Sequence, residues 1–213
     1  MKFRASQIGK LMTASRSKSE PLSEGARTEI MLLAKKHYYG YSSELNDRKV
    51  KKGIVQEQDS IDLLNMVRIE DYQKNDLRIE NDYITGCCDI ISDGIIDIKT
   101  SWDLDSFPAT IAEAEKKTNA KIYEWQLTAY MCLYDKPYAE LIYCMVDTDP
   151  LGVFGLLNDW DDLSLHRVSH IAPSKRITVL RYERDLEKEW KMMEHLKLCS
   201  EFYDICINEL EKK

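Results

Sequence analysis

Hydrophobic and polar positions change period several times along the chain, and each change marks an expected boundary between elements. Helical patterns of apolar residues predict five helices, over residues 5–12, 23–39, 50–67, 122–134 and 185–212. Alternating or β-branched apolar runs predict strands, three or four of them within residues 70–99 and one each over 138–147 and 176–183. A loop with a short helix is expected over residues 103–117, and an irregular stretch over 149–172. This order predicts an α/β protein with a central mixed β-sheet flanked by helices.

A single domain is the expected organisation, spanning residues 1–213. Its core is predicted over about residues 50–147. The N-terminal helices over residues 5–39 and a long C-terminal helix over 185–212 are elaborations on that core. The large apolar residues of the last helix are expected to pack into the core rather than to bind a ligand, namely Trp190, Met193, Leu196 and Phe202.

Composition narrows the compartment and the kinds of site. Hydrophobic residues make up 44% of the chain, and no apolar run approaches the length that spans a membrane. The first residues lack the apolar centre of a signal peptide. Six cysteines occur without a C-x-x-C pair, which argues against zinc or iron–sulfur sites and favours reduced, buried thiols. We therefore expect a cytoplasmic protein with no membrane partner.

Charge is distributed unevenly along the chain. The formal net charge is −7, but residues 1–53 carry 12 Lys/Arg against 5 Asp/Glu, and the remainder carries 18 against 32. Such asymmetry predicts a basic face able to meet phosphates and an acidic body. Chance clustering of charges on solvated helices is the alternative.

The segment over residues 83–102 carries most of the functional information. Two apolar runs meet at the Ser92-Asp93-Gly94 turn, which predicts a tight hairpin. Asp89 lies in the first run, and Asp97 and Lys99 share one face of the second. Charged groups beside an apolar sheet are costly to desolvate unless a cation or substrate compensates them. Other acid-x-Lys triplets lie in loops or on charged helix surfaces, so the strand context carries the signal.

Three further residues can join this cluster. Glu57 lies on the helix before the predicted sheet, while Gln126 and Tyr130 are at i and i+4 on the helix after it. Carboxylates of this kind suit one or two Mg²⁺ or Mn²⁺ ions, which promote attack of water on a phosphodiester. The alternatives are ordinary structural roles: a solvated Glu57, an Asp89 that caps backbone amides, an exposed Asp97–Lys99 pair, and helix-surface roles for Gln126 and Tyr130.

Four motifs, in order, resemble those of the PD-(D/E)XK nuclease superfamily, and within it the lambda-exonuclease/YqaJ-type viral recombinase group and its RecB-like relatives. They are the G-x-x-x-E helix (Gly53 to Glu57), the strand aspartate (Asp89), the (D/E)-x-K strand (Asp97-Ile98-Lys99) and the Q-x-x-x-Y helix (Gln126 to Tyr130). The resemblance covers roughly residues 3–147 and implies a restriction-endonuclease-like core.

The resemblance also implies a role for each matched residue. Asp89 and Asp97 would be metal ligands with the Ile98 carbonyl, and Glu57 would complete the metal shell, through water. Lys99 would position the nucleophilic water. Gln126 would touch the water on the metal or the scissile phosphate, and Tyr130 would brace the site or a nearby phosphate. Asp97 stands where many members have Glu, and Cys87-Cys88 replaces the usual proline before Asp89.

DNA contacts outside the motifs are also implied. The N-terminal helix of the family often holds the DNA end, for which Arg4, Ser6 and Lys10 are the candidates here. Trp102, just after the catalytic strand, is a candidate for stacking on a base, with simple packing as the alternative.

The predicted function is that of a Mg²⁺-dependent DNA exonuclease acting on linear duplex ends in phage-type recombination or DNA processing. It would act in the host cytoplasm if phage-encoded. A structure-specific or restriction-type endonuclease and a catalytically inactive DNA-binding module are the alternatives. A single-strand annealing protein and a homo-oligomer are implied partners by analogy.

Overall fold

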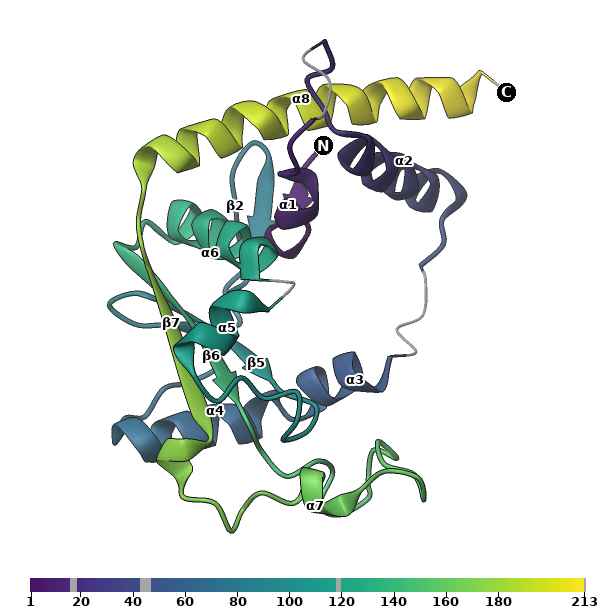
Figure 1. Cartoon of the computed structure of the whole chain (residues 1–213). Coiled ribbons are helices and arrows are strands. Elements are labelled where there is room, and N and C mark those ends of the chain that lie inside the picture. Colours follow the sequence, from purple (N-terminus) through teal and green to yellow (C-terminus); the bar gives the residue numbers. More distant parts are fainter. Residues whose placement is uncertain (16–18, 43–46, 118–119, 213) are drawn as a thin grey trace.

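Two mixed sheets with helices on both sides form the protein in this computed structural model, which describes residues 1–15, 19–42, 47–117 and 120–212 (Figure 1). The larger sheet has the order β4-β5-β6-β7, in which β5 and β6 are parallel and the two outer strands run antiparallel to their neighbours. Its strands are β4 (Ile90–Ile91), β5 (Ile95–Thr100), β6 (Tyr138–Cys144) and β7 (Ile177–Glu183). The smaller sheet has the order β1-β3-β2, with β1 (Phe3–Arg4), β2 (Ile79–Glu80) and β3 (Ile84–Gly86).

The five predicted helices are present, with one of them divided. They correspond to α1 (Ala5–Leu11), α2 (Glu24–Tyr39), α3 (Arg48–Val55) with α4 (Glu57–Arg68), α6 (Ala120–Tyr134) and α8 (Leu186–Glu211). The short helix expected over 103–117 is α5 (Ile111–Lys116), and the irregular stretch contains α7 (Leu163–His166) and a 3-10 turn (Pro173–Lys175). The predicted hairpin joins β4 to β5, and the strands predicted over 70–99 begin only at Ile79.

The break in the predicted helix 50–67 falls at Gln56, for a tertiary reason. The Gln56 amide nitrogen donates to the Asp147 carbonyl oxygen at 2.7 Å, and its side-chain oxygen accepts from the Asp149 backbone N–H at 3.0 Å. These partners follow β6, about ninety residues later in the chain. Buried amide groups must be paired, so this distant segment holds the junction between α3 and α4 in place.

Side chains of β5 separate onto the two faces of the sheet as predicted. Ile96 and Ile98 join an apolar cluster with Ile61 and Leu64 of α4. Asp97 and Lys99 therefore face the opposite side, where α6 lies. The alternation places the two charged residues on one helix-covered face of a buried strand.

The N-terminal helix packs closely on α6. A side chain at Gly9 would place its Cβ 2.5 Å from the Cα and carbonyl oxygen of Ile122, so only glycine permits this approach. Because Ile122 lies one turn before Gln126, the contact helps to fix the helix that carries the Q-x-x-x-Y motif.

The long helix α8 crosses one end of the molecule beside α2, away from α3 and α4 (Figure 1). Its Leu196 is fully buried, whereas Met193 and Phe202 are partly buried against the core. Trp190 is 63% exposed, so the prediction that it packs in the core is wrong. The buried stripe follows Met192, Leu196 and Cys199, and Trp190 lies off that stripe.

The cysteines are free thiols, as expected, although Cys87 and Cys132 are only partly buried. Among the described residues, no helix is both long enough and apolar enough to span a bilayer.

Replacement of Gly9 by alanine is expected to destabilise the fold by about 2 kcal/mol or more, because the neighbouring atoms belong to the Ile122 backbone and cannot rotate away. Urea denaturation would measure the change. Gly25→Ala is the matched control, since a Cβ there meets nothing closer than 3.8 Å and alanine favours a helix. Equal stability of the two variants would contradict the close packing.

Candidate active site

Asp89 and Asp97 face each other across the hairpin between β4 and β5. The register pairs Ile90 with Ile96, so the next step outward places Asp89 opposite Asp97. The Asp89 carboxylate accepts a hydrogen bond from the Ile98 backbone N–H at 2.6 Å. Burial, and next the charge of Asp97, raise the pKa of Asp89 well above its usual range. The two carboxylates are therefore held together at an electrostatic cost.

Lys99 and Gln126 compensate part of that cost. The Lys99 ammonium lies 2.5 Å from Asp97 Oδ2, and the Gln126 side-chain nitrogen donates to Asp97 Oδ1 at 3.0 Å. Although burial opposes it, Asp97 and Asp89 raise the pKa of Lys99, so this lysine stays charged. Asp97 is only 1% exposed, which excludes the alternative of a solvated surface pair.

Tyr130 braces Gln126 from the same face of α6. Its hydroxyl accepts from the Gln126 amide at 3.3 Å and donates to the Cys87 carbonyl oxygen at 3.0 Å. Burial raises the pKa of Tyr130, so the phenol keeps the proton that this second bond requires. The chain from Cys87 through Tyr130 and Gln126 to Asp97 thus links the strand before Asp89 to the central carboxylate.

Glu57 begins α4 and points into the same cleft from the other wall. Its carboxylate pairs with Lys74 Nζ at 2.9 Å rather than with the aspartates. Lys74 follows the sheet-preceding helix in a segment without periodicity, so its role was not predictable from the pattern.

An open cleft of about 650 Å³ joins these groups. Glu57, Asp89, Asp97, Ile98, Lys99, Gln126 and Trp102 all line it. Trp102 is largely buried there at 8% exposure, with the Arg48 guanidinium 5.1 Å from its ring. Arg4 and Ser6 are exposed outside the cleft lining, and Lys10 pairs with Glu29 at 3.3 Å. The structure thus gathers the four motifs and leaves the proposed DNA-end contacts apart from them.

The donor set fits a hard divalent cation. The Asp97 Oδ2 atom is buried without a hydrogen bond of good geometry, and Asp89 adds a second carboxylate near Lys99. Across the described part of the chain, no three His, Cys, Asp or Glu side chains converge into a complete ligand set. Mg²⁺ retains several waters and commonly takes only one or two protein carboxylates. Asp89, Asp97 and the Ile98 carbonyl are therefore the groups that would hold such an ion.

Further cleft residues escaped the sequence prediction. Lys49, Lys117, Tyr123 and Tyr143 also line the cleft. Lys99 lies 4.8 Å from the centre of the Tyr123 ring, and Tyr143 pairs with Lys99 in the β5–β6 register. Only the parallel pairing of two strands separated by a helix brings Tyr143 here, and that pairing has no local signal.

Known structures share this architecture. A crystal structure of a phage-related exonuclease from Haemophilus somnus 129PT has 30% sequence identity to the chain and a TM-score of 0.90, with 99% of this chain and 96% of that one covered. The alkaline exonuclease LHK-Exo from Laribacter hongkongensis has a TM-score of 0.71 at 13% identity, with 99% of this chain and 92% of that one covered. Its complex with dAMP gives 0.69 at 14% identity over the same shares.

Comparisons by sequence alone do not detect these relationships. No model of a protein family matches the chain. A search of curated proteins likewise finds no match.

Removal of one carboxylate should stabilise the metal-free protein. In EDTA at pH 8, Asp89→Asn is expected to raise the free energy of unfolding by about 1–2 kcal/mol, because a partly buried charge beside Asp97 disappears. The folded state keeps the Asp89 proton to higher pH than the unfolded state. This carboxyl therefore costs stability as pH rises above about 4.

The increase in unfolding free energy caused by Asp89→Asn should accordingly shrink as the pH falls and vanish below pH ~4. Urea denaturation between pH 4 and 8 would measure it, with the exposed Asp82→Asn as control. Added Mg²⁺ should raise the melting temperature of the wild type and not of Asp89→Asn. A destabilised Asp89→Asn would contradict the strained pair.

Proposed function

The chain belongs to the lambda-type exonuclease group of the PD-(D/E)XK nucleases, and from this premise we propose that it is a Mg²⁺-dependent deoxyribonuclease that degrades linear DNA from its ends. The observation that carries the proposal is the grouping of Asp89, Asp97 and Lys99 in an open cleft. The exonuclease names of the neighbours support the same reaction class.

The protein residues divide the work as follows. Asp89, Asp97 and the Ile98 carbonyl would hold one or two Mg²⁺ or Mn²⁺ ions. Such ions neutralise charge on a phosphodiester and lower the pKa of water. Lys99 remains protonated, so its ammonium orients the attacking water and stabilises charge that develops on the phosphate oxygens. Water attacks phosphorus directly as a P–O ester bond breaks, with no covalent enzyme intermediate.

Gln126 and Tyr130 keep this geometry fixed. Through its hydrogen bond to Oδ1, Gln126 turns the other Asp97 oxygen toward Lys99. Tyr130 in turn holds the Gln126 amide in place. Glu57 faces the same space and would reach the ions through water.

A role in phage-type recombination or DNA processing is part of the proposal. It is supported by the likeness to a phage-related exonuclease. In that setting a single-strand annealing protein would receive the strand that digestion exposes.

End dependence is tested by comparing a linear duplex bearing 5′-phosphates with a closed circle, each with Mg²⁺ or with EDTA. We expect only the linear form to be degraded, and only with Mg²⁺; gel electrophoresis would monitor the loss of each substrate. Cleavage of the circle would instead assign an endonuclease. Retained DNA binding without cleavage of either substrate would indicate an inactive binding module.

Asp97→Asn should separate catalysis from binding. We expect cleavage of the linear duplex to fall by about 10²–10³ or more, because a metal ligand and the partner of Lys99 are lost. DNA affinity in EDTA, measured by fluorescence anisotropy, should stay within a few-fold of the wild type. The exposed Asp82→Asn is the control, and undiminished cleavage by Asp97→Asn would overturn the assignment.

A further inference from the structure

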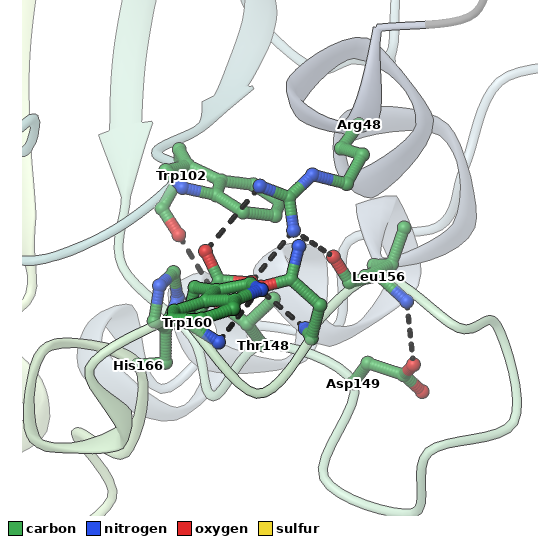
Figure 2. Close-up of polar contacts among 9 residues, drawn as sticks. Arg48, Trp102, Thr148, Asp149, Leu156, Trp160 and His166 are labelled. Atoms are coloured by element: carbon green, nitrogen blue, oxygen red, sulfur yellow. Dashed lines mark hydrogen bonds and ion pairs between the residues drawn. The ribbon is translucent and has the colours of Figure 1, made fainter.

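Helix α3 forms one wall of the cleft, and side-chain contacts on the side away from the cleft hold it in place. Arg48 contacts Asp161 at 2.6 Å and the Leu156 carbonyl oxygen at 3.0 Å, while its guanidinium lies beside the Trp102 ring (Figure 2). One turn further, Lys52 is fully buried. Its ammonium donates to the carbonyl oxygens of Trp102 and Val146 at 3.0 and 3.1 Å and to the Thr148 hydroxyl at 2.7 Å. The opposite face of α3 is thereby fixed toward the cleft.

Lys49 is the cationic residue on that cleft-facing side. It is exposed and lines the cleft together with Val50 and Gly53. The Asp47 carboxylate, which also lines the cleft, caps the helix by accepting the Lys49 backbone N–H at 2.8 Å. The side chain of Lys49 is thus presented to the cleft from a capped helix end.

Lys117 reaches the same space after α5. Its ammonium donates to the Ser106 carbonyl oxygen and lies 5.8 Å from the centre of the Tyr143 ring. Burial lowers the pKa of Lys117, Asp103 and Glu113 oppose this, and the charge of Lys49 adds to it. Two lysine ammonium groups that repel each other in one cleft would be stabilised by an anion between them.

Tyr143 lines the same cleft, with its ring near the Lys117 ammonium. It is 4% exposed, and within the described parts of the chain its buried hydroxyl has no hydrogen-bond partner. A buried hydroxyl without a partner is costly. In the register it stands beside Lys99, one strand away, a spacing of about 5 Å. A ligand that satisfied it would therefore adjoin the catalytic lysine.

Groups of both charges line the cleft. Asp89, Asp97 and Glu57 lie there with Lys99, and Lys49 and Lys117 add two further cations, with Asp47 as the carboxylate beside Lys49. A cation suits the aspartates, and an anion with several acceptor oxygens suits the two added lysines.

We infer that Lys49, Lys117 and the Tyr143 hydroxyl form a second phosphate subsite, which binds the phosphodiester next to the one that is cleaved. The inference rests on the proposed function and specifies how the substrate strand is placed. The residues of this subsite position the strand and take no part in the bond that breaks.

The first test measures DNA affinity in EDTA against salt concentration, so that cleavage plays no part. Lys49→Ala and Lys117→Ala should each weaken binding about five- to tenfold and reduce the slope of log K against log salt by about one. Tyr143→Phe, which removes only the hydroxyl, should weaken binding a few-fold with an unchanged slope. Lys116→Ala, an exposed neighbour outside the cleft, is the control and should change neither.

The second test locates the phosphate. Oligonucleotides carrying one neutral methylphosphonate at successive positions should bind the wild type more weakly when the substitution adjoins the cleaved linkage. For Lys117→Ala, a methylphosphonate at that position should not weaken binding further, because the contact between lysine and phosphate is already lost. Methylphosphonates at the other positions should weaken its binding as they do for the wild type. With Mg²⁺, the lysine variants should raise KM more than they lower kcat.

The outcomes distinguish this inference from the proposed function. A wild type that neither binds nor cuts DNA would refute the proposed function itself. A wild type that cuts normally, with Lys49→Ala and Lys117→Ala matching the Lys116→Ala control in affinity and salt slope, would overturn the subsite alone. A loss of affinity equal at every methylphosphonate position would also overturn it.

Discussion

Burial of the Asp97 carboxylate within the sheet is the constraint on which the rest of the site depends. A charge at 1% exposure requires partners from several directions, and the fold supplies them from separate elements. Lys99 comes from the same strand, Gln126 from α6, and Tyr130 fixes Gln126. Asp89 nevertheless adds a second negative charge beside it, so the cluster remains short of positive charge. This uncompensated negative charge lies where the proposed metal ion and the phosphate would bind.

Local patterns predicted the parts of the site that lie within single elements. The period of β5 placed Asp97 with Lys99, and the helical spacing placed Gln126 with Tyr130. Residues brought in by tertiary structure escaped prediction: Lys74 pairs with Glu57 across a loop, and Tyr143 joins through a parallel strand pairing. The break at Gln56 has the same origin, because its partners follow β6. Trp190 was misplaced because an apolar residue just off a buried stripe looks, in sequence, like one on it.

The fold persists where sequence similarity has almost disappeared. LHK-Exo retains a TM-score of 0.71 at 13% identity, and the phage-related exonuclease reaches 0.90 at 30%. Packing tolerates exchanges among apolar residues of similar volume, whereas a charged cluster tolerates few. The short motifs around Glu57, Asp89, Asp97 and Gln126 therefore carried more information than overall similarity, in keeping with a chain that matches no family model.

The anchoring of α3 has a consequence for biosynthesis. The wall that carries Lys49 is held by Thr148, Leu156 and Asp161, roughly a hundred residues later in the chain. A ribosome releases the N-terminal part first. The basic α3 segment therefore emerges long before the groups that fix it, and before the strand partner of β5. The α3 wall of the cleft can be anchored only after synthesis has passed Asp161, so a nascent chain carries the catalytic motifs before this wall is fixed.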